Sequence, residues 1–539
     1  MTHKLFALLF CFTMLGCAHQ HPSYDLVITN GRIADGSGNS WFRGDIAIRD
    51  GKIVAVNNGA GKMRDNRGFH SAKRIIDAKD MIVAPGFIDV HTHIEFGLFE
   101  RPTADNFLYN GVTSVITGNC GGSFDSVRDF LSRVDSERTS INVATLVGHN
   151  TVRRQVMGLN NRAATPMDQL KMDALVDTAM RDGAVGLSTG LIYLPGVYSD
   201  TAEVLSLAKV AAKHQGIYAS HIRNEGSRVV EAINEALDIG RAAKMPVQIS
   251  HFKVSAPVNW GRSIDTLRMI VEARQSGLDV TIDQYPYTAS STSLSVMLPD
   301  WAREGGDAAI KQRLGDAHQR KKIAAEILTT VVAAKRDGFG YAVVARHQAD
   351  ASFNGKSIAD IARSQGRGET LADGVETVID LLIAGGAQMI FHGMSEDDVR
   401  YFMRYPFNMV ASDGGVQNGR GMPHPRSYGT NARVLAKYVR DLKIISLEGA
   451  IRRMTSLAAQ KFQLKNRGWL REGYAADIVI FDESTVTDKS TFDKPHQFST
   501  GFEYVLVNGA VTIDSRQHNG VRAGVALRGP AYAGNVVGK

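Results

Sequence analysis

The chain is poor in cysteine, because its 539 residues include only Cys11, Cys17 and Cys120. So few cysteines exclude a framework of several disulfides. Concentrated positive charge is also missing: no long Lys/Arg run or basic helix face carries the formal net charge of +7, which argues against a nucleic-acid partner. Apolar residues make up 44% and charged residues 22% of the chain, as in ordinary globular proteins. The length allows one large domain and a smaller one.

The N-terminus has the pattern of an export signal. Lys4 supplies positive charge, and the eleven residues 5–15 are almost all apolar, too few to span a membrane but suited to the core of a signal peptide. The following Met14-Leu15-Gly16-Cys17 resembles the lipobox of bacterial lipoproteins. We therefore predict that residues 1–16 are a lipoprotein signal peptide and that Cys17 is lipidated, with ordinary secretory cleavage as the alternative. The expected location is the bacterial cell envelope, where the protein would be a periplasmic lipoprotein with a lipid anchor in the membrane. By resemblance to such lipoproteins, Ala18 after the cysteine favours the outer membrane over the inner membrane.

Both ends of the mature chain read as short β-strands. Residues 24–80 and 465–530 contain short apolar runs separated by Asn-Gly and Asp-Gly turns such as Asn30-Gly31 and Asn508-Gly509, a pattern typical of antiparallel strands. Because two such regions flank a long middle, we predict one small composite β-sandwich domain built from both ends.

The middle of the chain, residues 81–464, alternates apolar strands with helices. One predicted helix begins at Thr165-Pro166 and ends at Gly183, with Leu170, Ala174, Leu175 and Ala179 as its buried face. Eight continuous apolar strands alternating with helices indicate an α/β fold, a parallel (β/α)8 TIM-type barrel. The predicted strands are 81–90, 113–117, 141–147, 184–188, 218–221, 247–251, 280–283 and 408–412.

One interval breaks this alternation. About 125 residues separate the seventh and eighth predicted strands, several times the usual connection. We interpret residues 290–352 as an inserted lid subdomain over the barrel mouth; a passive surface excursion is the alternative.

Metal-binding residue types follow the ends of several predicted strands, where the active site of such a barrel lies. His91 and His93 project to the same side, because side chains alternate along a strand. His221 and His251 occupy the same Ser-His-apolar-basic pattern, thirty residues or one β-α unit apart. A thiolate, imidazoles and one carboxylate suit zinc better than magnesium or calcium. The candidate ligands are Cys120, His221, His251, His91, His93 and Asp413.

Longer motifs surround these residues: Ala84-Pro-Gly-Phe-Ile-Asp-Val-His-Thr-His93, Gly118-Asn-Cys-Gly121, Ser220-His-Ile-Arg-Asn-Glu225, Asp283-Gln-Tyr-Pro-Tyr287 and Ser412-Asp-Gly414. With them the chain resembles the amidohydrolase superfamily and, within it, the D-aminoacylase (N-acyl-D-amino-acid deacylase) group, over about residues 24–528. The resemblance implies that Cys120, His221 and His251 hold one tightly bound zinc. It also implies a second, weaker metal position among His91, His93 and Asp413.

The predicted activity is a zinc-dependent amide hydrolase that removes the acyl group from N-acyl-D-amino acids. A zinc-bound water is the expected nucleophile, and Asp413 is the expected general base and acid. The small-molecule substrate needs side chains that bind its carboxylate and orient it; the candidates are Lys253, Arg426, Arg223, Tyr285 and Ser291, the last two by resemblance.

Other activities remain open. One alternative is a dipeptidase acting on dipeptides with a C-terminal D-residue, or a hydrolase of a cyclic amide. Another is a zinc-binding envelope lipoprotein without turnover. His149 and His392 are expected to be structural.

Overall fold

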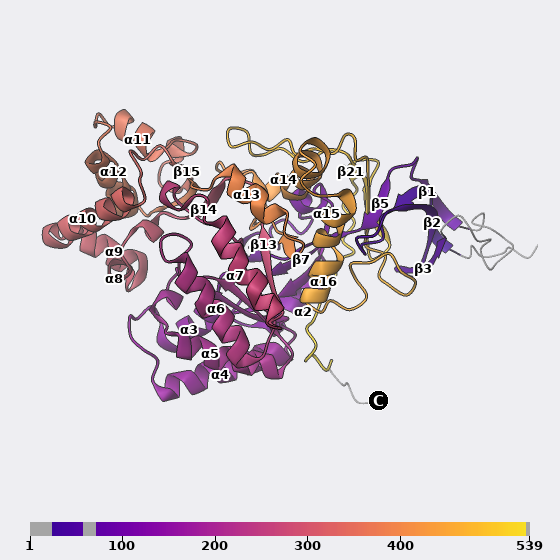
Figure 1. Ribbon diagram of the computed structural model, residues 1–539, viewed down its shortest axis with the longest axis horizontal. Coiled ribbons are helices and arrows are strands. Elements are labelled where there is room, and N and C mark those ends of the chain that lie inside the picture. Colours follow the sequence, from indigo (N-terminus) through magenta and orange to yellow (C-terminus); the bar gives the residue numbers. More distant parts are fainter. Residues whose placement is uncertain (1–23, 58–71, 535–539) are drawn as a thin grey trace, which may run out of the picture.

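The computed structural model describes residues 24–57 and 72–534. The predicted signal peptide and the lipidation site Cys17 lie outside these residues. A barrel occupies the centre of the elongated molecule, between a sheet that includes β1–β3 at one end and the helices α8–α12 at the other (Figure 1). No helix of the described residues is long and apolar enough to cross a membrane.

The sheet at one end contains strands from both ends of the chain. They form one nine-stranded mixed sheet, in which β5 joins the two groups by pairing parallel with β1 and antiparallel with β18. The predicted composite β unit is therefore present, but it is one mixed hydrogen-bonded sheet and not the predicted β-sandwich, because β5 pairs with strands of both chain ends. Its strands are β1 (Tyr24–Ile33), β2 (Phe42–Arg49), β3 (Lys52–Asn57), β4 (Ala72–Asp77), β5 (Ile82–Pro85), β18 (Ile478–Phe481), β19 (Phe502–Val507), β20 (Ala510–Asp514) and β21 (Gln517–His518).

The barrel strands are parallel and lie side by side in chain order, with β8 and β9 sharing the third position. The barrel closes where the Asp413 amide donates to the His91 carbonyl at 2.8 Å and where Thr92 bridges Gly414. The predicted (β/α)8 barrel is thereby confirmed. Its strands are β6 (Phe87–Asp89), β7 (Val112–Thr117), β8 (Asn142–Thr145), β9 (Val147–Gly148), β10 (Gly186–Gly190), β11 (Ile217–His221), β12 (Val247–Ile249), β13 (Val280–Gln284) and β17 (Asn408–Val410).

Helices cover the outside of the barrel. Thr165 and Asp168 form a capping box at the start of α4, as the sequence predicts. The predicted inner face of α4 is right only in part: Ala179 is buried and Leu175 packs against the core, but Leu170 is 63% exposed and Ala174 is exposed. The other buried residues of α4 are Met172, Val176 and Met180. The helices are α1 (Asp105–Leu108), α2 (Val127–Glu137), α3 (His149–Met157), α4 (Pro166–Arg181), α5 (Thr201–Lys213), α6 (Val229–Ala243), α7 (Ser263–Gln275), α13 (Glu396–Met403), α14 (Arg426–Arg433), the π-helical η7 (Val434–Asp441), α15 (Leu447–Met454) and α16 (Ser456–Lys461).

The apolar run predicted as one barrel strand, 81–90, is divided at Gly86. Residues before it form β5 in the end sheet, and residues after it form β6 in the barrel. A Cβ at Gly86 would lie only 2.2 Å from the Thr113 hydroxyl oxygen, so glycine lets the chain pass close to β7. The first barrel strand therefore begins at Phe87 rather than at residue 81.

The insertion between β13 and β17 has its own core and a three-stranded antiparallel sheet in the order β14-β16-β15. The expected end at residue 352 is too early, because β16 is the central strand of this sheet and Met389 lies in the core. The elements of the insertion are β14 (Ala289–Ser293), α8 (Asp300–Arg303), α9 (Gly306–Gly315), α10 (Ala317–Ala333), β15 (Ala342–His347), α11 (Ile358–Ser364), α12 (Leu371–Ile383) and β16 (Ala387–His392).

Candidate metal centre and substrate cavity

The six candidate metal ligands meet at the carboxyl ends of the barrel strands. The histidines and the aspartate follow or end β6, β11, β12 and β17, and Cys120 follows β7. Two compact groups contain five of the six: His91, Cys120 and His251, and His91, His93 and Asp413; His221 forms a third group with His251 and Glu225. Side chains more than three hundred positions apart are thus brought together as barrel geometry requires.

Cys120 lies at the centre of the first group. Its sulfur is 3.3 Å from His91 Nε2, 3.5 Å from His221 Nδ1 and 3.5 Å from His251 Nε2. Tetrahedral zinc with Zn–S and Zn–N bonds of about 2.3 and 2.1 Å separates its sulfur and nitrogen ligands by about 3.5 Å. Burial raises the pKa of the Cys120 thiol well above its usual value, so a thiolate here requires a nearby cation. The donor set and its spacing fit zinc.

Asp413 organises the second group. Its Oδ1 is 3.1 Å from His93 Nε2 and 3.6 Å from His91 Nε2, and its Oδ2 is 2.8 Å from a guanidinium nitrogen of Arg426. Burial alone would raise the pKa of Asp413, but the charge of Arg426 and the neighbouring imidazoles hold that pKa well below its usual value. Since His91 Nε2 faces both Cys120 and Asp413, His91 lies at the junction of the two groups.

Three of the ligands have an unusual backbone conformation. Cys120, His251 and Asp413 have φ angles of +52°, +34° and +50°, in the left-handed half of conformational space that residues other than glycine seldom occupy. Such conformations cost about 1–3 kcal/mol each and concentrate at functional sites. Here they occur just after the ends of β7, β12 and β17.

A cavity of about 850 Å³ extends from the metal ligands to the insertion. On the barrel side His93, Cys120 and Asp413 line it; Ser291 of β14 and Arg346 of β15 line it on the insertion side. The insertion therefore forms part of the wall, as expected of a lid.

The three predicted substrate-binding cations have different surroundings. Arg426 is 4% exposed and lines the cavity. Lys253 is close to the metal centre, but its ammonium lies 2.6 Å from Glu225 and 2.7 Å from His251 Nδ1. Arg223 makes two 2.9 Å hydrogen bonds to Glu235 of α6 and does not line the cavity. The charge of Arg223 is thus paired with Glu235, and its contact with substrate stays a prediction.

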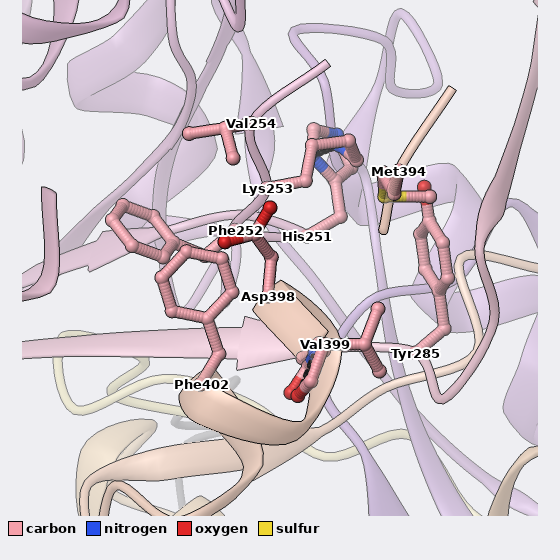
Figure 2. A pocket seen from close by; sticks show the side chains of 10 residues that line it. His251, Phe252, Lys253, Val254, Tyr285, Met394, Asp398, Val399 and Phe402 are labelled. Carbon is pink, nitrogen blue, oxygen red and sulfur yellow. Dashed lines mark hydrogen bonds between the residues drawn. The ribbon is translucent and has the colours of Figure 1, made fainter. Parts of the chain in front are cut away.

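Tyr285 lies between the two remaining cations. Lys253 Nζ is 5.6 Å and Arg426 Cζ is 4.6 Å from the centre of its ring. Its buried hydroxyl has no hydrogen-bond partner among the described residues. Figure 2 shows Tyr285, with Met394, facing His251 and Lys253 across a small cavity of about 10 Å³. The Tyr285 hydroxyl is therefore unpaired but buried, and Tyr285 does not line the 850 Å³ cavity.

Glu225, His149 and His392 lie outside the set of predicted ligands and substrate-binding residues. No role near the metal centre was predicted for Glu225, although it ends the motif Ser220–Glu225. The available signal was its position four residues after His221. His149 has a structural partner, because its Nε2 is 2.7 Å from the buried Glu203, which also pairs with Arg153. His392 lies in β16 and packs against Phe492.

The chain is similar to known deacylases over nearly its whole length. The sequence profile described as "Amidohydrolase family" matches residues 74–513. A D-aminoacylase from Alcaligenes xylosoxydans xylosoxydans is 33% identical over 527 residues, covering 94% of this chain and 97% of the relative.

Two solved structures share the fold closely. A D-aminoacylase structure concerned with its binuclear metal centre is 31% identical, covers 94% of this chain and all of that chain, and superposes with a TM-score of 0.79. The N-acyl-D-glutamate deacylase from Bordetella bronchiseptica, solved with zinc and a phosphonate inhibitor, is 35% identical, covers 94% of this chain and 99% of that chain, and has a TM-score of 0.79. The chain described here belongs to the amidohydrolase family, in its D-aminoacylase group.

Proposed function

We propose that the protein is a zinc-dependent hydrolase that removes the acyl group from N-acyl-D-amino acids. The observation that carries this proposal is the Cys120 thiol, which lies 3.3–3.5 Å from three imidazole nitrogens at the end of a cavity. The related D-aminoacylase and N-acyl-D-glutamate deacylase support the substrate class.

Cys120, His221 and His251 would hold the tightly bound zinc, and His91, His93 and Asp413 would surround a second, weaker position. A bound zinc supplies a Lewis acid for the amide carbonyl and lowers the pKa of water to about 7. Asp413 Oδ1 points to the histidine pair while Oδ2 is held by Arg426. Asp413 therefore takes the proton of the attacking water and returns it to the departing amine.

The free α-carboxylate of the substrate is assigned to Arg426, with Tyr285 and Ser291 beside it. Arg426 retains guanidinium donors beyond the one that faces Asp413, and the Tyr285 hydroxyl is free to donate. Lys253 is a weaker candidate, because Glu225 already neutralises its charge. Because Arg426 lies next to Asp413, a substrate whose carboxylate binds Arg426 would have its scissile amide beside the metal centre.

The test is a substrate screen with purified, zinc-loaded protein. We expect amine release from N-acetyl-D-methionine, much slower release from its L-enantiomer, and little from the dipeptide L-methionine-D-methionine. Preferential cleavage of the dipeptide would instead support the dipeptidase alternative. Zinc-loaded protein that releases amine from none of these compounds or from a cyclic amide would refute the hydrolase assignment and favour a zinc-binding protein without turnover.

We also propose a periplasmic location with a lipid anchor at Cys17. Its support is the sequence of residues 5–17 alone. An anchored enzyme at the envelope surface would meet acylated D-amino acids outside the cytoplasm.

A further inference from the structure

Glu225 lies behind the metal centre, where it faces the outer nitrogens of two candidate ligands. Its Oε1 is 3.0 Å from His251 Nδ1 and 3.8 Å from His221 Nε2. The opposite ring nitrogens, His251 Nε2 and His221 Nδ1, are the ones that face Cys120. The carboxylate is therefore within hydrogen-bonding distance of His251, whereas His221 Nε2 lies farther away and has no hydrogen-bond partner among the described residues.

Lys253 makes this arrangement more than a simple histidine–carboxylate pair. Its ammonium is 2.6 Å from Glu225 and 2.7 Å from His251 Nδ1, and Figure 2 shows its side chain beside the His251 ring. An ammonium only donates hydrogen bonds, whereas a carboxylate only accepts them. A hydrogen bond from Lys253 thus requires His251 Nδ1 without a proton, whereas a hydrogen bond to Glu225 requires a proton on Nδ1.

Metal binding requires the form of His251 that has its proton on Nδ1. A neutral imidazole that binds a metal through Nε2 carries its proton on Nδ1 and must find an acceptor there. Glu225 is that acceptor, and it also draws the Lys253 ammonium to itself. Without Glu225, the ammonium would donate to Nδ1 and leave the ring proton on Nε2, where it blocks the metal.

The position of Glu225 is fixed by its own loop. The Asn224 side chain accepts from the amides of Gly226 and Arg228 at 2.9 and 3.0 Å. The Glu225 carbonyl accepts from the Ser255 amide at 2.8 Å, which ties the loop after β11 to the loop after β12. The carboxylate is therefore held in place before any metal arrives.

We propose that Glu225 is a positioning residue of the metal centre. It keeps His251 in the form that binds metal through Nε2, in competition with the Lys253 ammonium, which lies 2.7 Å from the same Nδ1. This inference rests on the proposed function in one respect, namely that the site binds zinc.

The experiment measures the zinc dissociation constant by competition with a chromogenic chelator for the full chain and four variants. We expect Glu225→Gln to bind zinc about 10- to 100-fold more weakly, and Glu225→Asp to recover part of the loss. Lys253→Met should weaken zinc binding less than Glu225→Gln does, because Glu225 still accepts from His251. Glu231→Gln is the matched control, since Glu231 is an exposed carboxylate in the first turn of α6.

Two outcomes overturn the inference: zinc affinity of Glu225→Gln equal to that of wild type, or a loss in Lys253→Met as large as in Glu225→Gln. Circular dichroism and thermal melting check the fold. Should Glu225→Gln not fold, zinc binding by Glu225→Asp is compared with Glu225→Asp/Lys253→Met; tighter binding by the double variant supports the inference and no change overturns it. Wild-type protein that binds no zinc would instead refute the proposed function.

Discussion

Replacing Arg426 with methionine tests which side chain recognises the substrate carboxylate. Arg426 is 4% exposed, lines the cavity and lies 2.8 Å from Asp413 Oδ2. Methionine keeps an apolar stem but removes the charge and all hydrogen-bond donors. The variant therefore loses the contact to the substrate and the contact to Asp413 together.

The substrate contact can be given a magnitude. A hydrogen bond to a charged group contributes about 1.5–3 kcal/mol. At about 1.4 kcal/mol per factor of ten, its loss lowers kcat/KM by about 10- to 150-fold. The lost contact to Asp413 adds a further decrease that does not depend on the carboxylate of the substrate.

A pair of substrates separates the two effects. N-acetyl-D-methioninamide lacks the carboxylate charge, so its hydrolysis reports only the effect through Asp413. We expect the ratio of kcat/KM for the acid to that for the amide to fall about 10- to 150-fold in Arg426→Met. Lys253→Met should change this ratio less, because its charge is paired with Glu225. An equal loss on both substrates in Arg426→Met would refute the carboxylate assignment.

Further variants test the remaining roles. Cys120→Ala should lose zinc from the tight position and all turnover, measured by metal analysis after dialysis and by amine release. Asp413→Asn should lower kcat about 10²- to 10⁴-fold while one zinc remains bound; loss of that zinc would contradict the role of Asp413 as base. Glu203→Gln leaves the buried Arg153 without its ion-pair partner and should lower the free energy of unfolding by about 3–5 kcal/mol in urea titrations. Burial would raise the pKa of Glu203, but the hydrogen bonds and charges of His149 and Arg153 together outweigh it and lower that pKa from its usual value. Wild type should therefore lose stability as pH falls below its unfolded-state pKa, and the variant should lose less. Cys17→Ser should abolish incorporation of labelled palmitate and release the protein from membranes, and unchanged labelling would exclude Cys17.

The barrel could be predicted because its strands are buried on both faces and therefore apolar throughout, a local property of the sequence. The six ligands followed from their positions at strand ends. The division at Gly86 could not, because it depends on pairing of β5 with β18, almost four hundred positions away. Glu225 lies in a loop, where no periodicity marks the direction of a side chain. The pairing of Arg223 with Glu235 could not be predicted, because Glu235 lies on the helix α6 rather than beside Arg223 in the sequence.

Charge balance gives a physical reason why the centre should need metal. The buried carboxyl groups around it are Asp89, Asp283, Glu225 and Asp413, and the buried basic side chains are Lys253 and Arg426. Burial raises the pKa of Asp89 to about 6, and the Cys120 thiol is shifted in the same direction. Both shifts arise mainly from burial, so each group favours its neutral form unless a cation lies nearby. A divalent cation between the thiol and the imidazoles supplies that charge, so the same ion that provides the chemistry also stabilises the ends of the strands that bind it.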